Sequence, residues 1–164
     1  MTAFPEAPFG AADRIELDPM PLAVVRHVGI RFDDLREAFD AGYAAVGRQF
    51  GTGALVPAGP ALAIYHGNPM EEFDLELGFP VASAPADPID ADGVLITAST
   101  LPSGPAVATT YLGAYDGLGT GWSGLVERAV SAGLMPRGIS IEVYVSDPTE
   151  RAERLRTDLI LPLT

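Results

Sequence analysis

Two distant stretches of this chain are versions of one segment. VPAGPALAIYHGNP (56–69) aligns without a gap with MPRGISIEVYVSDP (135–148), so that Tyr65 matches Tyr144 and Pro69 matches Pro148. Upstream, HVGIRFDDLREAF aligns with YLGAYDGLGTGW with one residue inserted, and downstream DLELGFPV aligns with TDLILPL. Three matches in the same order predict two copies of one module within a single domain. We place the copies at about 14–80 and 94–163, and the linker between them at 82–93.

Each copy is predicted to contain two strands, a helix and two further strands. The expected strands lie at 14–17, 22–28, 60–66 and 73–80 in the first copy, and at 94–101, 106–112, 138–145 and 155–162 in the second. The helices are indicated by apolar residues at helical spacing from Leu35 to Val46 and from Leu118 to Val130. This pattern predicts an α+β fold with antiparallel sheets and a pseudo-twofold axis that relates the copies.

The strand GISIEVYVSDP (138–148) carries one charge among apolar residues. Side chains alternate across a strand, so Ile141 and Val143 point one way while Glu142 and Tyr144 point the other. We expect the apolar face to pack on the helix and the Glu142 face to point away from it. An ordinary solvated strand residue is the simpler interpretation of Glu142 from its position alone.

The matching strand of the first copy has the same alternation. Leu62 and Ile64 are expected to pack on the first helix, and Ala63 and Tyr65 to point away from it. Related by the repeat, the two outward faces are predicted to meet and form a central cleft.

Composition limits the class of protein. Of the 164 residues, 48% are hydrophobic and 20% charged, which is typical of a folded globular chain. No apolar run approaches the roughly 20 residues that span a bilayer. The first residues have neither the basic start nor the apolar core of an export signal, so we expect a cytoplasmic protein. The absence of cysteine excludes disulfides and thiolate chemistry.

The formal charge of −12 limits the binding partners, because the chain has only ten Lys and Arg residues but 22 Asp and Glu residues. Phosphate backbones are bound by basic residues, so direct nucleic-acid binding is not expected. An acidic surface favours cations, although solubility alone also explains it.

These motifs, in this order and spacing, resemble the GyrI-like, or AraC-type effector-binding, small-molecule-binding domain of bacteria. The resemblance rests on HVGIRFDDLREAF, LAIYHGNP with FDLELGFPV, YLGAYDGLGTGW, and IEVYVSDP followed by RTDLILPL. It implies a duplicated strand-helix-strand-strand fold with a ligand cavity between the copies. It also implies that Glu142 is the central glutamate that contacts cationic aromatic ligands. Many members carry a tyrosine where Ile160 stands, so one aromatic wall differs here.

The resemblance also implies a partner. Members are often fused to a DNA-binding domain, whereas here about a dozen residues precede the first expected strand. We therefore expect a stand-alone module that acts through a small-molecule ligand or a separate regulator or enzyme.

Five aromatic residues join Glu142 as candidate ligand-binding residues. Tyr144 and Tyr65 occupy matched positions on the two strands, although strands favour aromatic residues in any case. Trp122 lies on the apolar stripe of its helix and is a core residue on that evidence, but its ring edge could line the cavity. Tyr111 and Tyr115 flank the junction of strand and helix, a predicted pocket rim.

Other constellations are weaker. His27 and His66 are the only histidines, and a metal site needs further ligands, so we expect no metal and no cofactor. GLGTG (117–121) lacks the spacing and the context of a dinucleotide loop and is interpreted as a flexible entry to the second helix. No Gly-x-Ser-x-Gly elbow is present, and we assign no catalytic residue.

Three functions remain open. The favoured one is binding or sequestration of hydrophobic, often cationic, aromatic molecules. The second is hydrolysis of strained electrophiles such as cyclopropane-bearing DNA alkylators, with Glu142 as the base. The third is a protein–protein inhibitor of the gyrase type, which needs an exposed apolar or strongly charged patch.

Overall fold

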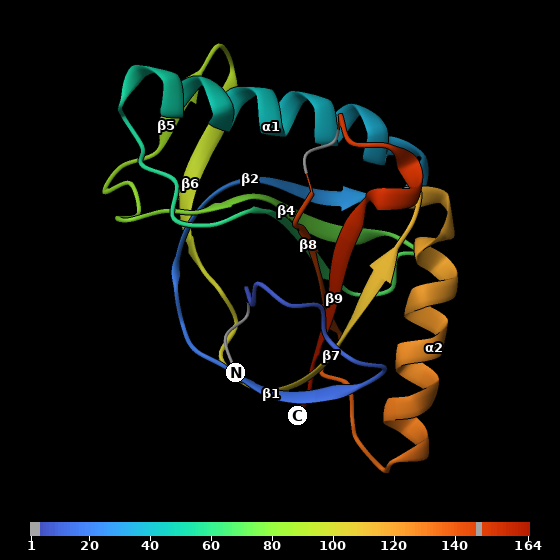
Figure 1. The fold of residues 1–164 in the computed structure, drawn as a ribbon. Coiled ribbons are helices and arrows are strands. Elements are labelled where there is room, and N and C mark those ends of the chain that lie inside the picture. The colour runs from blue at the N-terminus through green and yellow to red at the C-terminus, as the bar shows by residue number, and fades with distance from the viewer. Residues whose placement is uncertain (1–3, 147–148) are drawn as a thin grey trace. The chain divides into compact units, whose positions relative to one another are not determined.

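The computed structural model describes residues 4–146 and 149–164 and divides the chain into two compact units. Unit 1 comprises residues 1–18 and 102–164, and unit 2 comprises Pro19–Leu101. In each unit a helix lies along an antiparallel sheet (Figure 1). Pro148, which the repeat pairs with Pro69, lies outside the described residues.

Unit 2 is built on a five-stranded antiparallel sheet. Its strands, in spatial order, are β3 (Ala61–His66), β4 (Phe73–Pro80), β2 (Pro21–Ile30), β6 (Val94–Thr100) and β5 (Ile89–Ala91). A 3-10 turn, η1 (Phe32–Asp34), leads into α1 (Leu35–Thr52). The helix ends at Gly53, whose φ of 80° is a left-handed conformation that glycine adopts without steric cost.

The core of unit 2 forms where α1 meets the sheet. Small helix residues allow a close approach: a Cβ on Gly42 would lie 3.2 Å from Leu77 Cδ1. Phe50 of α1 packs edge-on against Phe79 of β4, with ring centroids 4.9 Å apart. The buried residues of this cluster are Ala23, Val25, Ala45, Val46, Leu55, Val81, Ala91 and Ile96.

Unit 1 is built on a four-stranded antiparallel sheet. Its strands, in spatial order, are β1 (Asp13–Leu17), β7 (Gly104–Leu112), β9 (Arg156–Pro162) and β8 (Ile139–Tyr144). The helical segments are η2 (Tyr115–Gly117), α2 (Leu118–Ser131) and η3 (Ala152–Arg154). The buried residues of the cluster between α2 and the sheet are Val107, Leu125, Ala129, Leu159, Leu161 and Leu163.

An ion pair ties the N-terminal segment to unit 1. Arg156 donates to both carboxylate oxygens of Asp158, which is fully buried, at 3.0 and 2.9 Å. The same guanidinium also donates to the backbone carbonyls of Pro5, Glu6 and Ala7. The segment is thus part of the folded unit.

The predicted α+β class, the antiparallel pairing and the two helices are confirmed. Two details differ from the expectation. β1, expected to belong with the first copy, pairs with β7, and β6, expected to belong with the second copy, pairs with β2. The expected linker also contains a strand, β5. The equivalence of the two copies stays a prediction, although each unit repeats the order strand, 3-10 turn, helix, strand, strand.

The prediction of which strand face meets each helix was wrong. Glu142 is the register partner of Leu159, which lies in the core beneath α2, so Glu142 and Tyr144 are on the helix side of the sheet. Ile141 and Val143 are fully buried on the opposite side.

In unit 2, Ala63 pairs with Leu77, the residue that contacts Gly42 of α1, so Ala63 and Tyr65 are likewise on the helix side. Leu62 and Ile64 are fully buried on the other face. Because β3 and β8 carry buried side chains on both faces, alternation shows which residues share a face but not which face meets the helix.

Candidate functional site

Glu142 lies in the middle of β8, and only 6% of the residue is exposed. A carboxylate in such a position loses its hydration, which is costly unless other groups stabilise the charge. The neighbours of Glu142 therefore decide what the site can do.

Trp122 and Tyr144 are neutral donors to this carboxylate. The indole Nε1 of Trp122 donates to Oε2 at 2.8 Å, and the hydroxyl of Tyr144 donates to Oε1 at 2.6 Å. Both distances are in the range of hydrogen bonds to a charged acceptor. Tyr144 is close because residues two apart on a strand share a face, whereas Trp122 is brought in by the packing of α2.

Tyr115, in η2, adds a second ring to the site. Its ring lies edge-on to that of Tyr144, with centroids 5.9 Å apart and an interplanar angle of 75°. Burial raises the pKa of Tyr115, and the negative charge of Glu142 raises it further. The shift indicates that the field of the carboxylate reaches this phenol, which stays protonated at neutral pH.

Tyr111, at the end of β7, packs under the start of α2. A Cβ on Gly117 would collide with the Tyr111 hydroxyl, and a Cβ on Gly121 would lie 3.0 Å from Leu159 Cδ1. Gly117 and Gly121 therefore have a steric role, because they make room for Tyr111 and for the sheet beneath the helix, whereas Gly119 faces open space.

Tyr65 belongs to unit 2. It is largely buried on the helix side of β3, and its ring lies 5.7 Å from that of Phe73. The structure thus brings Glu142, Trp122, Tyr144 and Tyr115 together within unit 1, while Tyr65 packs against Phe73 within unit 2.

A buried carboxylate of unit 2 was not foreseen. Glu76 of β4 accepts hydrogen bonds from His66 Nε2 at 2.7 Å, Ser99 Oγ at 2.5 Å and Arg26 Nη2 at 3.3 Å. Burial alone would raise the pKa of Glu76, but the bonds from His66 and Ser99, the charge of His66 and the bond from Arg26 lower it to about 2. A signal was available, because Glu76 stands in an apolar strand just as Glu142 does.

The two histidines have different environments. His66 belongs to the Glu76 cluster, while Nε2 of His27 is buried and has no hydrogen-bond partner among the described residues. Burial lowers the pKa of His27, so its ring is neutral at pH 7. In the part of the chain that the structure describes, no three metal-ligating side chains converge.

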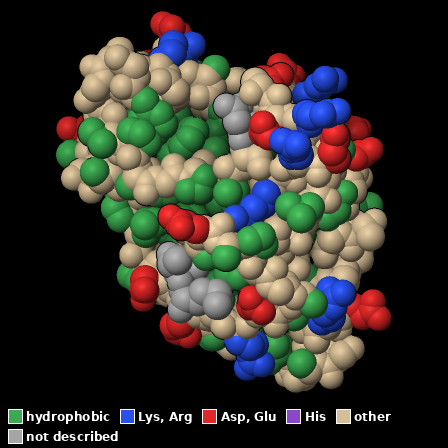
Figure 2. Space-filling view, viewed as in Figure 1, with side chains coloured by type: hydrophobic (Ala, Val, Ile, Leu, Met, Phe, Trp, Pro, Cys, Tyr) green, Lys and Arg blue, Asp and Glu red, His purple; other side chains and the backbone are tan. Residues whose placement is uncertain are grey.

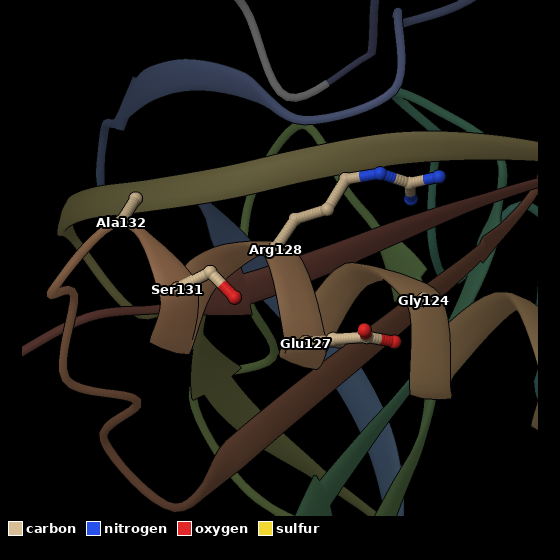
Figure 3. Close-up of a pocket in the computed structure, with 5 residues that line it drawn as sticks. All are labelled: Gly124, Glu127, Arg128, Ser131 and Ala132. Carbon is tan, nitrogen blue, oxygen red and sulfur yellow. The ribbon is translucent and has the colours of Figure 1, made fainter.

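Surface hollows occur away from Glu142. One lies on the solvent side of α2, lined by Gly124, Glu127, Arg128, Ser131 and Ala132 (Figure 3). Another, in unit 2, is lined by Pro19, Met20, Pro21, Ala84, Ala98, Ser99 and Thr100. Neither includes a predicted site residue.

Acidic side chains are scattered among hydrophobic ones on the face that Figure 2 shows. No helix among the described residues has the length and apolarity to cross a membrane.

Several solved structures share this fold. The C-terminal domain of EcmrR aligns with a TM-score of 0.75 at 16% identity, over 93% of this chain and 96% of that chain. SAV2435 bound to tetraphenylphosphonium aligns with a TM-score of 0.64 at 10% identity, over 93% of each chain. A hydrolase encoded by lin2189 from Listeria innocua aligns with a TM-score of 0.66 at 15% identity, over 97% and 94%. At such identities the similarity shows the fold alone.

Among curated proteins, no sequence matches the chain. The family model of the GyrI-like small molecule binding domain, in contrast, matches residues 13–164. The chain therefore belongs to the GyrI-like small-molecule-binding family.

Proposed function

We propose that the site around Glu142 binds a lipophilic cation with aromatic groups. The observation that carries this proposal is the buried carboxylate, held by Trp122 and Tyr144 with Tyr115 alongside. Neutral donors orient a carboxylate without removing its charge, so a cation placed next to it gains a strong attraction in a poorly hydrated site.

The surrounding rings support the same class of ligand. Tyr144 and Tyr115 meet edge to face. Trp122, which donates a hydrogen bond to Glu142, contributes a third aromatic group. Aromatic faces attract cations and also provide apolar area for a ligand's own rings. The similarity of fold to SAV2435 bound to tetraphenylphosphonium agrees with this ligand class.

The hydrogen bonds favour binding over hydrolysis. A general base must accept a proton from water, but each carboxylate oxygen of Glu142 already accepts a hydrogen bond that competes with a water molecule. Hydrolysis of a strained electrophile remains the alternative, because the Tyr144 hydroxyl, 2.6 Å from Oε1, is placed to pass a proton. The fold similarity to the Listeria innocua hydrolase is compatible with either function.

Titration with tetraphenylphosphonium tests the proposal. We expect micromolar binding that Glu142→Gln weakens by about 1–3 kcal/mol, roughly 5- to 150-fold, because a charge-assisted interaction is lost. Glu142→Gln should weaken the binding of uncharged triphenylphosphine oxide much less. Glu127→Gln, on the exposed side of α2, should change the affinity for neither ligand. Equal losses for both ligands would show that Glu142 does not pair with the cation.

A turnover assay separates the two functions. Limiting protein is incubated with an excess of a cyclopropane-bearing electrophile, and product is counted per protein molecule. We expect at most one event per molecule. Many turnovers that disappear in Glu142→Ala would make this protein a hydrolase.

A further inference from the structure

We propose that the tip of unit 2 is an interaction surface for a basic, amphipathic protein segment. The tip consists of residues 28–34, where β2 runs into η1, and residues 67–74, the turn from β3 into β4. Three of its large apolar residues are strongly exposed: Val28 by 71%, Phe32 by 64% and Met70 by 85%. Because this surface does not use Glu142, the inference goes beyond small-molecule binding.

The two segments of the tip lie side by side. Ile30 pairs with Phe73 in the sheet, after a bulge that follows His27. The amide of Gly29 donates to Asp74 Oδ1 at 2.9 Å, and a Cβ on Gly29 would lie 3.9 Å from Glu72 Oε1. The apolar residues of the bulge and of the turn therefore belong to one region of the surface.

The turn that carries Met70 is closed by its own hydrogen bonds. The Met70 amide donates to Asn68 Oδ1 at 3.0 Å, and the Glu71 amide donates to the Asn68 carbonyl at 3.0 Å. These bonds set the conformation that leaves the Met70 side chain in solvent.

The turn that carries Phe32 is closed in the same way. The Arg31 amide donates to Asp34 Oδ2 at 2.9 Å, and the Asp34 amide donates to the Arg31 carbonyl at 2.9 Å. Both turns thus present apolar side chains outward from a fixed backbone, which lowers the entropy lost when a partner binds.

The charge of the tip selects the partner. Residues 28–34 and 67–74 contain one arginine, Arg31, and five carboxylates, Asp33, Asp34, Glu71, Glu72 and Asp74. This charge repels nucleic acids and anionic membranes. It also disfavours a second copy of the chain, whose net charge is −12. A segment with both basic and apolar side chains complements it.

The shape of the tip favours a macromolecule over a small ligand. Small ligands bind in concave sites that bury most of their surface, whereas these three side chains project into solvent. Protein interfaces combine an apolar centre with a polar rim, which matches Val28, Phe32 and Met70 among carboxylates. An amphipathic helix with lysine or arginine beside its apolar stripe fits this pattern.

Fluorescence anisotropy with a labelled amphipathic peptide of leucine and lysine tests the inference. The tip variant combines Val28→Ser, Phe32→Ser and Met70→Ser. The matched control removes three apolar side chains that are also exposed but lie elsewhere, in Leu95→Ser, Val130→Ser and Met135→Ser. We expect the tip variant to bind at least about tenfold more weakly, about 1.4 kcal/mol, and the control to stay within about twofold of the wild type.

Three further measurements complete the test. Circular dichroism and thermal unfolding must show that both variants fold. The double variant Glu71→Gln, Glu72→Gln removes two charges, so it should also weaken peptide binding and reduce the salt dependence of that binding. A lysine–serine peptide of equal charge should bind poorly. Equal weakening in the tip and control variants, or equal binding of the lysine–serine peptide, would overturn the inference.

Binding of tetraphenylphosphonium separates this inference from the proposed function. The tip variant should bind that cation as the wild type does, and Glu142→Gln should bind the peptide as the wild type does. Loss of cation binding in the tip variant would make the tip a small-molecule site instead.

Discussion

Replacement of Glu76 by glutamine is expected to destabilise unit 2 in a pH-dependent way. The pKa of Glu76 falls from an ordinary value of 4.5 to about 2 in the folded chain. A difference of one in pKa corresponds to about 1.4 kcal/mol, so the cluster contributes about 3 kcal/mol at neutral pH. Most of this comes from His66 and Ser99, because Arg26 is more than half exposed and its attraction is screened.

The sign of the pH dependence follows from the lowered pKa. The folded state binds the proton of Glu76 less readily than the unfolded state, so the stabilisation is complete above about pH 4.5 and is lost as the pH falls towards 2. The wild type should therefore exceed Glu76→Gln in stability by about 3 kcal/mol at pH 7. The difference should shrink steadily below pH 4.5.

The assay has to report on the correct unit. Trp122 is the only tryptophan and lies in unit 1, so its fluorescence would follow the other part of the chain. Hydrogen exchange of the amides of β2, β3 and β4, measured by mass spectrometry in urea at several pH values, follows the strands around Glu76. Glu127→Gln, which removes an exposed carboxylate, is the control. A stability difference that does not change with pH would refute the assignment of the lowered pKa to the folded cluster.

Two other changes test the packing of unit 1. Gly117→Ala should destabilise the protein by about 1–3 kcal/mol, because the new methyl group meets the Tyr111 hydroxyl. Tyr111→Phe in the same chain should restore part of the loss in a urea titration, and no recovery would show that the contact is not the cause. Arg156→Ala should cost about 3–5 kcal/mol, since it leaves the buried Asp158 without its cationic partner. It should also speed hydrogen exchange near residues 5–10, and unchanged exchange there would contradict the role of Arg156 as an anchor.

Local sequence patterns determined the elements of this protein. Apolar residues at helical spacing placed both helices, and alternation between turns placed the expected strands within two residues of their observed bounds, whereas β5 was not expected. These signals are readable because each depends on neighbours in the chain. The carboxylate of Glu142 stood out for the same reason, and so did its neighbour Tyr144 on the same face of the strand.

Pairing over long distances was decided by the tertiary structure. β1 and β6 pair with β7 and β2, which were not the partners expected from the order of the repeat, because alternation within a strand does not specify which strand lies beside it. The choice of helix-covered face also depended on packing, since β3 and β8 carry buried side chains on both faces.

The candidate site also combines residues that the sequence predicted with residues that only the tertiary structure brings together. Its charge and the donor Tyr144 were visible in a few consecutive residues, but Trp122 reaches Glu142 only because α2 packs across β7 and β9. The Glu76 cluster draws its donors from β2, β3 and β6. Hydrogen bonds of that kind join residues far apart in the chain, so they exist only once the sheet has formed, and no local pattern of residues encodes them.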